Sequence, residues 1–372
     1  MRRSLAFCAL LGALGAPEEA PSQVPSGMFG GDPRHTGRVS LRGPHTEPSV
    51  AWRVRTRRRV FASPVVTREG LVVFGSLDGS VLAVDPRGVT RWAWTAPGRV
   101  FSAPAWWRDL VVLGHDARAF VALDARGSVR WQVPTPDDAD APPMVGPDGT
   151  VYLASREVCA VDPSNGAVRW RTALQGHAFG APALAPDGTL WVTELGGGLD
   201  AFRATDGTAR PRIPLPGAVH GGALVLDDNA VVVAVSDGHV RCFNADGSPR
   251  WDSALEGSGR SLGSRGTPAL TREGLVVLGG EDGAVYGLRA ADGQRVFRTQ
   301  TFGPVRSSVR VDADGWLFVG SEDDRVYGLR PDGSVGWSVS VGADVDTSPA
   351  ILPNGSLVVG ADDGALHCLQ AP

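Results

Sequence analysis

Residues Ala160–Trp170 read AVDPSNGAVRW, and variants of this phrase recur along the chain. AVDPRGVTRW ends at Trp92 and ALDARGSVRW ends at Trp131, with looser versions ending at Trp251 and Trp337. In each copy a short run of β-forming residues leads into a turn with Asp and Gly, and a second run carries the Trp. Short β-forming runs joined by such turns predict antiparallel strands connected by tight hairpins.

The phrase is part of a longer repeat. A pair of small residues, usually ending in Pro, recurs at spacings of 40, 39, 39, 41, 45, 40 and 41 residues, which defines eight units. The pairs are Ser63-Pro64, Ala103-Pro104, Pro142-Pro143, Ala181-Pro182, Gly222-Ala223, Thr267-Pro268, Ser307-Ser308 and Ser348-Pro349. Each unit contains four β-forming runs, in the first unit PVVT, LVVFG, SVLAVD and VTRWAW. Four short strands per unit predict an all-β fold, an eight-bladed β-propeller with four-stranded antiparallel blades.

The last unit ends at Gln370, directly after its third run, and so lacks a fourth strand and a Trp. The missing strand is present upstream, because SVAWRVRT (49–56) places Trp52 forty residues before Trp92. We therefore expect the N-terminal strand to complete the last blade and to close the ring, so that residues 48–372 form one propeller without an open edge. The indoles of the outer strands are expected to cover the joins between blades. They are Trp52, Trp92, Trp131, Trp170, Trp251 and Trp337.

The first residues, MRRSLAFCALLGALGA, pair two Arg with a short apolar stretch. This pattern predicts a signal peptide over residues 1–15, followed by an irregular exported lead-in over residues 16–47. The apolar stretch is too short to span a bilayer, so no transmembrane segment is expected in the mature chain. We expect an exported monomer that is periplasmic, outer-membrane-associated or at the cell surface.

Composition excludes several kinds of function. The net charge of -4 does not support nucleic-acid binding, which needs a basic surface. Cys159, Cys242 and Cys368 fall in predicted interior strands of different units, so we expect buried thiols without disulfides. No zinc-type spacing of His and Cys is present, and no metal is expected.

Two weaker motifs have simple structural explanations. Gly259–Gly263 (GRSLG) matches the Gly-x-Ser-x-Gly nucleophile pattern, but it lies in a long link without a following helix and is interpreted as a linker. Asp312 and Asp314 resemble part of a calcium loop, with Glu322 close behind in sequence. The strand between them would separate the two acidic groups to opposite ends of one blade, so they are interpreted as turn residues.

The innermost strands suggest a binding site. Three residues before the second member of each pair, one side chain per blade is expected at one end of the central channel. These residues are Phe61, Phe101, Asp140, Phe179, His220, Arg265, Val305 and Asp346. Aromatic rings facing charged groups could hold a peptide or loop with one apolar anchor, or could simply fill the channel.

The AVDPSNGAVRW phrase resembles the tryptophan-docking motif of propellers related to pyrroloquinoline-quinone (PQQ) dehydrogenases. SGMFGGDPRHTGR (26–38) is similar to the lead-in of such exported repeat proteins. Two blades depart from the motif, with Arg210 and Phe297 in place of Trp. One branch of the family is implied to hold a quinone and calcium beside a vicinal cysteine pair, and this chain has no adjacent cysteines.

The other branch consists of BamB-like eight-bladed scaffolds without enzymatic activity. The resemblance to that branch implies a non-enzyme without cofactor that binds a protein or peptide partner at the bacterial envelope. The alternatives are a minimal quinone-dependent dehydrogenase and a carbohydrate-binding surface protein.

Overall fold

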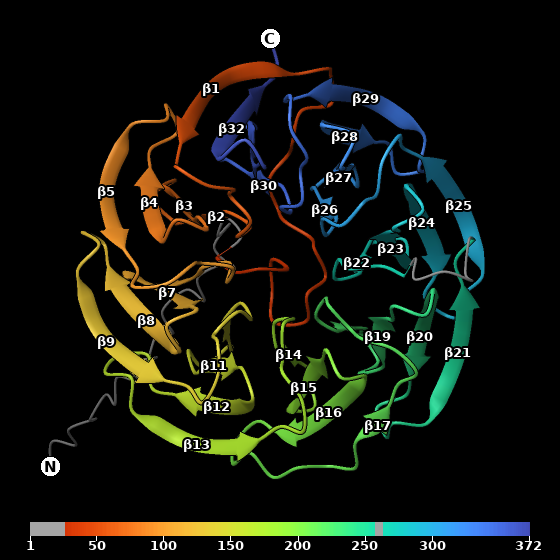
Figure 1. Cartoon of the computed structure of the whole chain (residues 1–372). Helices are drawn as coiled ribbons and strands as arrows, with labels where there is room; N and C mark the ends of the chain where they lie inside the picture. Colours follow the sequence, from red (N-terminus) through yellow and green to blue (C-terminus); the bar gives the residue numbers. More distant parts are fainter. Residues whose placement is uncertain (1–26, 257–262) are drawn as a thin grey trace, which may run out of the picture.

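The computed structural model describes residues 27–256 and 263–372. Within these ranges the chain forms 32 strands and no helix, and the strands pair into eight four-stranded antiparallel sheets. The sheets are arranged as blades around a central axis (Figure 1). The predicted all-β fold, an eight-bladed β-propeller, is confirmed. The predicted signal peptide and most of the Gly259–Gly263 stretch lie outside the described residues.

The blades are numbered in chain order, and the strands of each blade are given from the axis outward. Blades 1 to 4 are β2 (Val65–Val66), β3 (Val72–Gly75), β4 (Ser80–Val84), β5 (Thr90–Thr95); β6 (Ala105–Trp107), β7 (Leu110–His115), β8 (Ala119–Asp124), β9 (Val129–Pro134); β10 (Met144–Val145), β11 (Val151–Ala154), β12 (Glu157–Val161), β13 (Val168–Ala173); and β14 (Ala183–Leu184), β15 (Thr189–Glu194), β16 (Gly198–Arg203), β17 (Ile213–Pro214). Blades 5 to 8 are β18 (Leu224–Val225), β19 (Val231–Ala234), β20 (His239–Phe243), β21 (Pro249–Ala254); β22 (Ala269–Leu270), β23 (Leu275–Gly279), β24 (Ala284–Arg289), β25 (Arg295–Gln300); β26 (Arg310–Val311), β27 (Leu317–Gly320), β28 (Arg325–Leu329), β29 (Val335–Ser340); and β30 (Ala350–Ile351), β31 (Leu357–Gly360), β32 (Ala365–Gln370), β1 (Ser49–Arg55).

The core is divided among the joins between blades. Every residue of the second strands β3 and β31 is buried, because each blade is covered on both faces by its neighbours. Val73 of blade 1 and Val111 of blade 2 belong to one hydrophobic cluster, whereas Val72 of blade 1 and Val358 of blade 8 belong to another. Each blade is thus held by apolar contacts on two sides, and the ring must close for the first and last blades to have both.

The ring closes as the sequence predicts. β1 pairs with β32 in antiparallel register, with Trp52 opposite Cys368 and Val54 opposite Leu366. The outer strand of blade 8 therefore comes from the N-terminal side of the propeller, and its other three strands come from the C-terminal end (Figure 1). β1 alternates between exposed and half-buried residues, as expected for an outer strand with one face toward solvent.

The recurring phrase is explained by contacts between neighbouring blades. In blade 1, the Asp85 carboxylate accepts hydrogen bonds from the backbone of Arg87 and Val89, and this closes the turn. Gly88 in that turn has a φ of 81°, and an added Cβ would lie 2.8 Å from the indole of Trp52. Only glycine allows this approach without strain. Four indoles donate in the same way to a carbonyl of the next blade: Trp52 to Pro86 (3.0 Å), Trp131 to Pro163 (2.7 Å), Trp170 to Ala204 (2.9 Å) and Trp251 to Ala290 (2.9 Å).

The other outer strands differ in detail. Trp92 covers Gly127, but its Nε1 has no hydrogen-bond partner. Phe297 covers Gly333 in the same position. In blade 4, however, Ile213 and not Arg210 lies against the turn glycine of the next blade, Gly247. Arg210 does stand at the repeat position of the Trp, because its backbone N–H donates to the carbonyl of Ala201. The outer strand of blade 4 is, however, reduced to Ile213–Pro214, and the contact with the turn glycine passes to Ile213.

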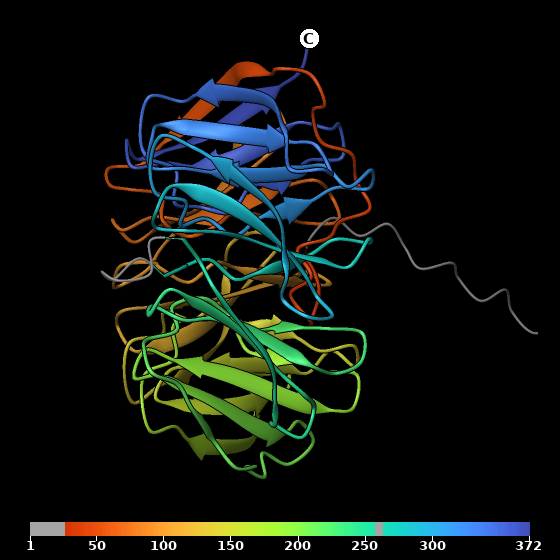
Figure 2. The ribbon, with the colours of Figure 1, turned by 90° about the vertical axis from the view of Figure 1, so that its right-hand side faces the viewer.

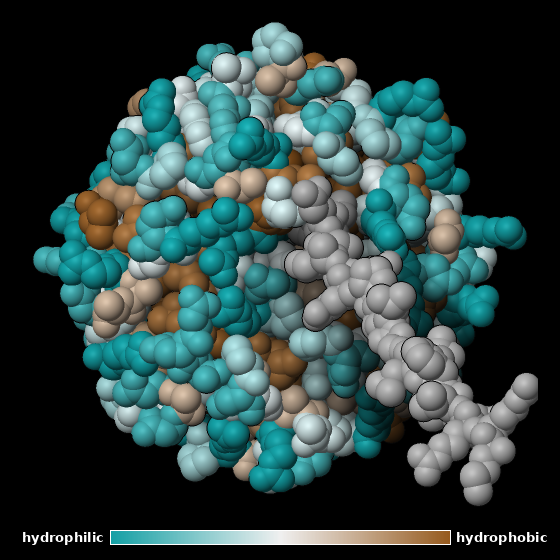
Figure 3. Space-filling model, turned by 180° about the vertical axis from the view of Figure 1, so that it is seen from behind, coloured by the Kyte–Doolittle hydropathy of each residue, from teal (hydrophilic) through white to brown (hydrophobic). Residues whose placement is uncertain are grey.

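The described part of the lead-in, residues 27–47, crosses the axis at the back of the ring, the face opposite the front view of Figure 1 (Figures 1 and 2). Its backbone carbonyls accept hydrogen bonds from innermost strands of four blades: Pro33 from Leu184, Arg34 from Val225, Thr36 from Leu270 and Gly37 from Val311. His35 and Thr36 are buried. This segment therefore covers the axis from behind, where hydrophilic residues surround separate hydrophobic patches (Figure 3).

The lead-in also completes the last join. Trp337 in β29 donates its Nε1 hydrogen to the carbonyl of Pro44 at 2.8 Å. Blade 8 has no hairpin between its third and fourth strands, because these come from opposite ends of the propeller. Pro44 thus replaces the turn carbonyl that blades 1, 3, 4 and 6 supply to the indoles of their neighbours. Nearby, Asp312 accepts hydrogen bonds from Gly43 N and His45 Nε2, so the carboxylate interpreted as a turn residue also fastens the lead-in.

Three cysteines are described. Cys159, Cys242 and Cys368 are free and buried in blades 3, 5 and 8. Burial raises the pKa of each thiol to about 12, so they are unreactive at neutral pH. In the described part of the chain, no helix is long and apolar enough to cross a membrane.

Candidate functional site

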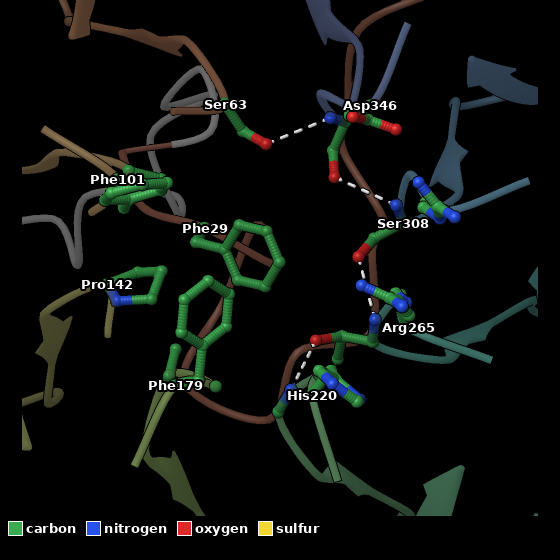
Figure 4. A pocket seen from close by; sticks show the side chains of 18 of the residues that line it. Phe29, Ser63, Phe101, Pro142, Phe179, His220, Arg265, Ser308 and Asp346 are labelled. Atoms are coloured by element: carbon green, nitrogen blue, oxygen red, sulfur yellow. Dashed lines mark hydrogen bonds between the residues drawn. The ribbon is translucent and has the colours of Figure 1, made fainter. Parts of the chain in front are cut away.

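A pocket of about 410 Å³ lies on the axis and opens at the face opposite the lead-in (Figure 4). The structure brings seven of the eight predicted ring residues together in its wall: Phe61, Phe101, Asp140, Phe179, His220, Arg265 and Asp346. They precede the innermost strands, so each blade contributes one side chain at the same height. Phe29 of the lead-in also lines the pocket. The channel is therefore closed from behind and forms a pocket.

The eighth predicted residue, Val305, does not line the pocket. It is fully buried in the join between blades 6 and 7, and Arg306 takes the wall position. The prediction was wrong by one residue because Ser308 was matched to Pro349 of blade 8, whereas its equivalent in that blade is Ser348. Gly320 ends β27 of blade 7 and Gly360 ends β31 of blade 8, so equivalent residues of these two blades are 40 positions apart. The residue 40 positions before Asp346 of blade 8 is Arg306 of blade 7. Alignment on the second strands would have found it.

The wall contributed by blades 1 to 4 is mostly apolar. The Phe61 and Phe101 rings meet edge to face with centroids 5.4 Å apart. Phe29, Phe179 and Pro142 continue this surface (Figure 4). Phe29 could not be assigned from the repeat, because it belongs to the lead-in and has no equivalent in any blade.

The opposite wall is polar and charged. Arg265 Nε lies 2.7 Å from Glu281 Oε1, and Arg306 donates to both oxygens of the same carboxylate at 2.9 and 3.1 Å. Arg306 also donates to Glu322. Arg59, which lines the pocket between blades 8 and 1, pairs with Asp362. Each guanidinium on this wall is therefore already paired with a carboxylate.

Hydroxyl groups connect the innermost strands beneath the polar wall. Backbone N–H groups donate to a hydroxyl oxygen of the next blade, from Gly222 to Thr267 (2.7 Å), Thr267 to Ser308 (2.9 Å), Ser308 to Ser348 (3.0 Å) and Ser348 to Ser63 (2.9 Å) (Figure 4). We call these four residues, Ser63, Thr267, Ser308 and Ser348, the hydroxyl belt. The equivalent residues of blades 2 to 4 are Ala103, Pro142 and Ala181, which have no hydroxyl. The belt thus spans blades 5 to 8 and 1 and crosses the ring closure.

The polar wall has unusual protonation properties. Burial raises the pKa of Asp346, and the nearby Asp362 carboxylate adds to the shift. Burial raises the pKa of Glu322 to about 7, Asp346 reinforces the shift, and Arg306 opposes it. Burial lowers the pKa of His220, helped by the charge of Arg265, so this imidazole is neutral at pH 7.

Near the apolar wall, three acidic residues converge. Asp116, Asp138 and Asp140 each offer an oxygen within 4.8 Å of the other two. Asp116 is paired with Arg99, and Asp140 Oδ2 lies 3.4 Å from His177 Nε2. Calcium usually takes six to eight oxygen ligands, more than these three carboxylates supply. Nothing in the sequence groups these three residues, because Asp116 lies in a different blade from the other two.

The residues around the pocket differ from the quinone and calcium site that the resemblance implies for the dehydrogenase branch. The described residues that line the pocket include no cysteine, and the three free cysteines lie in three separate blades. The acidic residues of the polar wall are committed to Arg59, Arg265 and Arg306 or lie beside them. The donor set therefore does not fit the vicinal cysteine pair and calcium cluster that the resemblance implies.

Comparison with solved structures shows similar folds. BamB from Moraxella catarrhalis has a TM-score of 0.69 and 20% identity, covering 87% of this chain and 98% of that chain. A quinohemoprotein alcohol dehydrogenase from Comamonas testosteroni has a TM-score of 0.77 and 13% identity, covering 93% and 80%. A europium-containing methanol dehydrogenase has a TM-score of 0.78 and 14% identity, covering 94% and 98%. At these identities the likeness shows the fold alone.

Comparison with curated protein sequences gives no match. A family model does match, over residues 45–141, 138–210 and 154–309, and its description is outer membrane protein assembly factor BamB. These matches together span 45–309, well over half of the 372 residues. The chain therefore belongs to this family of PQQ-like repeat propellers.

Proposed function

We propose that the protein is a non-enzymatic scaffold that binds a protein or peptide partner at the bacterial cell envelope through the axial pocket. The observation that carries the proposal is the pocket itself, which is closed from behind and has one apolar and one polar wall. Its volume of about 410 Å³ suits one or two side chains of a partner and not a whole folded domain. The BamB family membership supports a location in the envelope and a role in assembly.

The pocket has the features of a site for a protruding loop. Aromatic side chains that converge in a desolvated pocket are typical anchors of binding energy in protein interfaces. The ion pairs of the polar wall lie at the mouth, with Arg265 and Arg59 about half exposed, where charge steers and orients a partner. The belt hydroxyls accept backbone hydrogen bonds and hold the strands in place, which is a structural role.

An affinity capture tests the proposal. Wild-type protein and the Phe101→Ala/Arg265→Ala double variant are used to capture partners from an envelope extract, followed by identification of the bound proteins. The matched control is Phe302→Ala/Arg126→Ala, which removes the same two side-chain types at exposed positions outside the pocket. We expect wild type and control to retain one shared partner and the pocket variant to lose it.

Equal capture by the pocket variant, at an unchanged melting temperature, would contradict the proposal. An absorption spectrum of the purified protein tests the minimal quinone-dependent dehydrogenase at the same time. That alternative requires a bound chromophore and calcium-dependent dye reduction, and both would replace the scaffold proposal.

A further inference from the structure

The polar wall contains a carboxylate without a hydrogen-bond donor. The Asp346 side chain is 6% exposed and lines the pocket, and its Oδ1 is buried without a partner. Its Oδ2 is 3.5 Å from Arg59 Nη2, but that guanidinium pairs more closely with Asp362. A buried carboxylate without donors is costly, so a ligand that brings a donor and a positive charge would be favoured here.

A second carboxylate faces the same space from blade 3. Asp140 lines the pocket, its Oδ1 is also buried without a partner, and its side chain is 15% exposed. Asp140 and Asp346 approach the pocket from different sides of the ring. Each residue therefore brings to the pocket wall a carboxyl group with one oxygen that has no hydrogen-bond partner, although that oxygen is covered in the free protein.

The charges of the polar wall disfavour an anion. The guanidinium groups of Arg59, Arg265 and Arg306 face the four carboxyl groups of Asp346, Glu281, Glu322 and Asp362, of which Glu322 is only partly ionised at neutral pH because its pKa is raised to about 7. His220 adds no charge at pH 7, because burial lowers its pKa. An anionic ligand would have to compete with carboxylates that already occupy all three guanidinium groups.

The apolar wall is compatible with the same ligand. Phe29, Phe61, Phe101 and Phe179 present aromatic rings, and such rings attract guanidinium or ammonium groups when water is excluded. Arg99 already lies over the Phe101 ring, with its Cζ 5.2 Å from the centroid. A long side chain with a methylene stem and a cationic end would contact both walls at once.

We propose that the axial pocket receives a basic side chain, arginine or lysine, of the partner, held by Asp346 and Asp140 and enclosed by the phenylalanine rings. This inference rests on the proposed scaffold function and specifies the chemistry of its partner. It replaces the apolar anchor expected from the sequence with an apolar stem that ends in a cation.

The test uses small probes and the full chain. Butylguanidinium is compared with butylurea, its neutral counterpart, and with pentanoate, an anion of similar length, by calorimetry or ligand-observed NMR. We expect butylguanidinium to bind at least tenfold more tightly than the other two. Asp346→Asn should weaken its binding at least tenfold, and the exposed control Glu273→Gln should leave it unchanged. Asp140→Asn serves as a second pocket variant.

Three results would overturn the inference: equal or tighter binding of butylurea or pentanoate, full cation affinity in both Asp variants at wild-type melting temperature, or no binding of any probe. The capture experiment with Phe101→Ala/Arg265→Ala separates this failure from that of the scaffold. If capture still depends on the pocket while the cation shows no preference, only the basic side chain is rejected. If capture is also unchanged, the scaffold proposal is rejected.

Discussion

The two walls of the axial pocket are built by the same repeat and have opposite chemistry. Blades 1 to 4 place three phenylalanines and one aspartate at the wall position, namely Phe61, Phe101, Asp140 and Phe179, and blades 5 to 8 place His220, Arg265, Arg306 and Asp346 there. The strands below differ as well, because the hydroxyl belt joins the innermost strands under the polar wall and is replaced by Ala103, Pro142 and Ala181 elsewhere.

This difference shows how a symmetric fold can carry an asymmetric site. Turn glycines and outer-strand side chains hold the blades in equivalent positions, so the backbone does not distinguish one wall from the other. One position per blade then sets the chemistry. Below the charged wall, the belt hydroxyls accept hydrogen bonds from backbone N–H groups of the neighbouring blade and so keep these groups paired.

The largest effect on stability is expected from a truncation that removes the N-terminal segment, because both walls of the pocket depend on it. Truncation before Arg57 deletes β1, the Pro44 carbonyl bound by Trp337 and Phe29 of the apolar wall. Blade 8 then loses its outer strand and the ring loses its closure. The melting temperature should fall by on the order of 10 °C or more, measured by circular dichroism. Truncation before Gly27 is the control and should keep the wild-type value. An unchanged melting curve for the longer truncation would refute closure by this segment.

An intermediate effect is expected from breaking the belt under the polar wall. Thr267→Val keeps the shape of the side chain but leaves the buried N–H of Gly222 without its acceptor. The free energy of unfolding should decrease by about 1 to 3 kcal/mol in denaturant titrations. Thr267→Ser retains the hydroxyl and should recover most of this loss. If the Thr267→Val and Thr267→Ser variants have the same free energy of unfolding, the belt does not stabilise the polar wall.

A smaller effect concerns the charges of the polar wall. The pKa of Glu322 is raised to about 7, so the folded state holds more protons than the unfolded state between about pH 4.5 and 7. Its contribution to stability therefore falls as pH rises through this window, by at most about 3 kcal/mol. Glu322→Gln should lose less stability between pH 5 and 8 than wild type in urea titrations. Glu273→Gln should behave like wild type, and an identical pH dependence in all three proteins would contradict the assignment.

Most of the fold could be predicted from the sequence because it depends on local, repeated signals. Asp and Gly at fixed spacing mark the turns, and Trp52 in register with Trp92 indicates the strand that closes the ring. Arg210 replaces the Trp of blade 4 as the repeat predicts, but the repeat did not show that this blade has a shortened outer strand in which Ile213 makes the contact with the turn glycine. A repeat does not report where one copy is irregular.

The pocket could be predicted less completely, for two physical reasons. Val305 and Arg306 are adjacent in the sequence, and successive side chains of an extended segment point to opposite sides. Val305 is therefore buried between blades, whereas Arg306 lines the pocket. Phe29 reaches the axis through a segment held mainly by backbone hydrogen bonds, as between Pro33 O and Leu184 N. Such contacts leave no pattern in the side chains, so nothing in the sequence indicated that the lead-in closes the channel.

The path of the lead-in also orients the molecule. The carbonyl of Gly27 accepts a hydrogen bond from Trp106, near the turn that follows β6 on the back of the ring. Any tether joined ahead of this residue, whether a surface for immobilisation or a fusion partner, would thus hold the propeller by its rear. The mouth would then point outward and stay accessible without a long spacer.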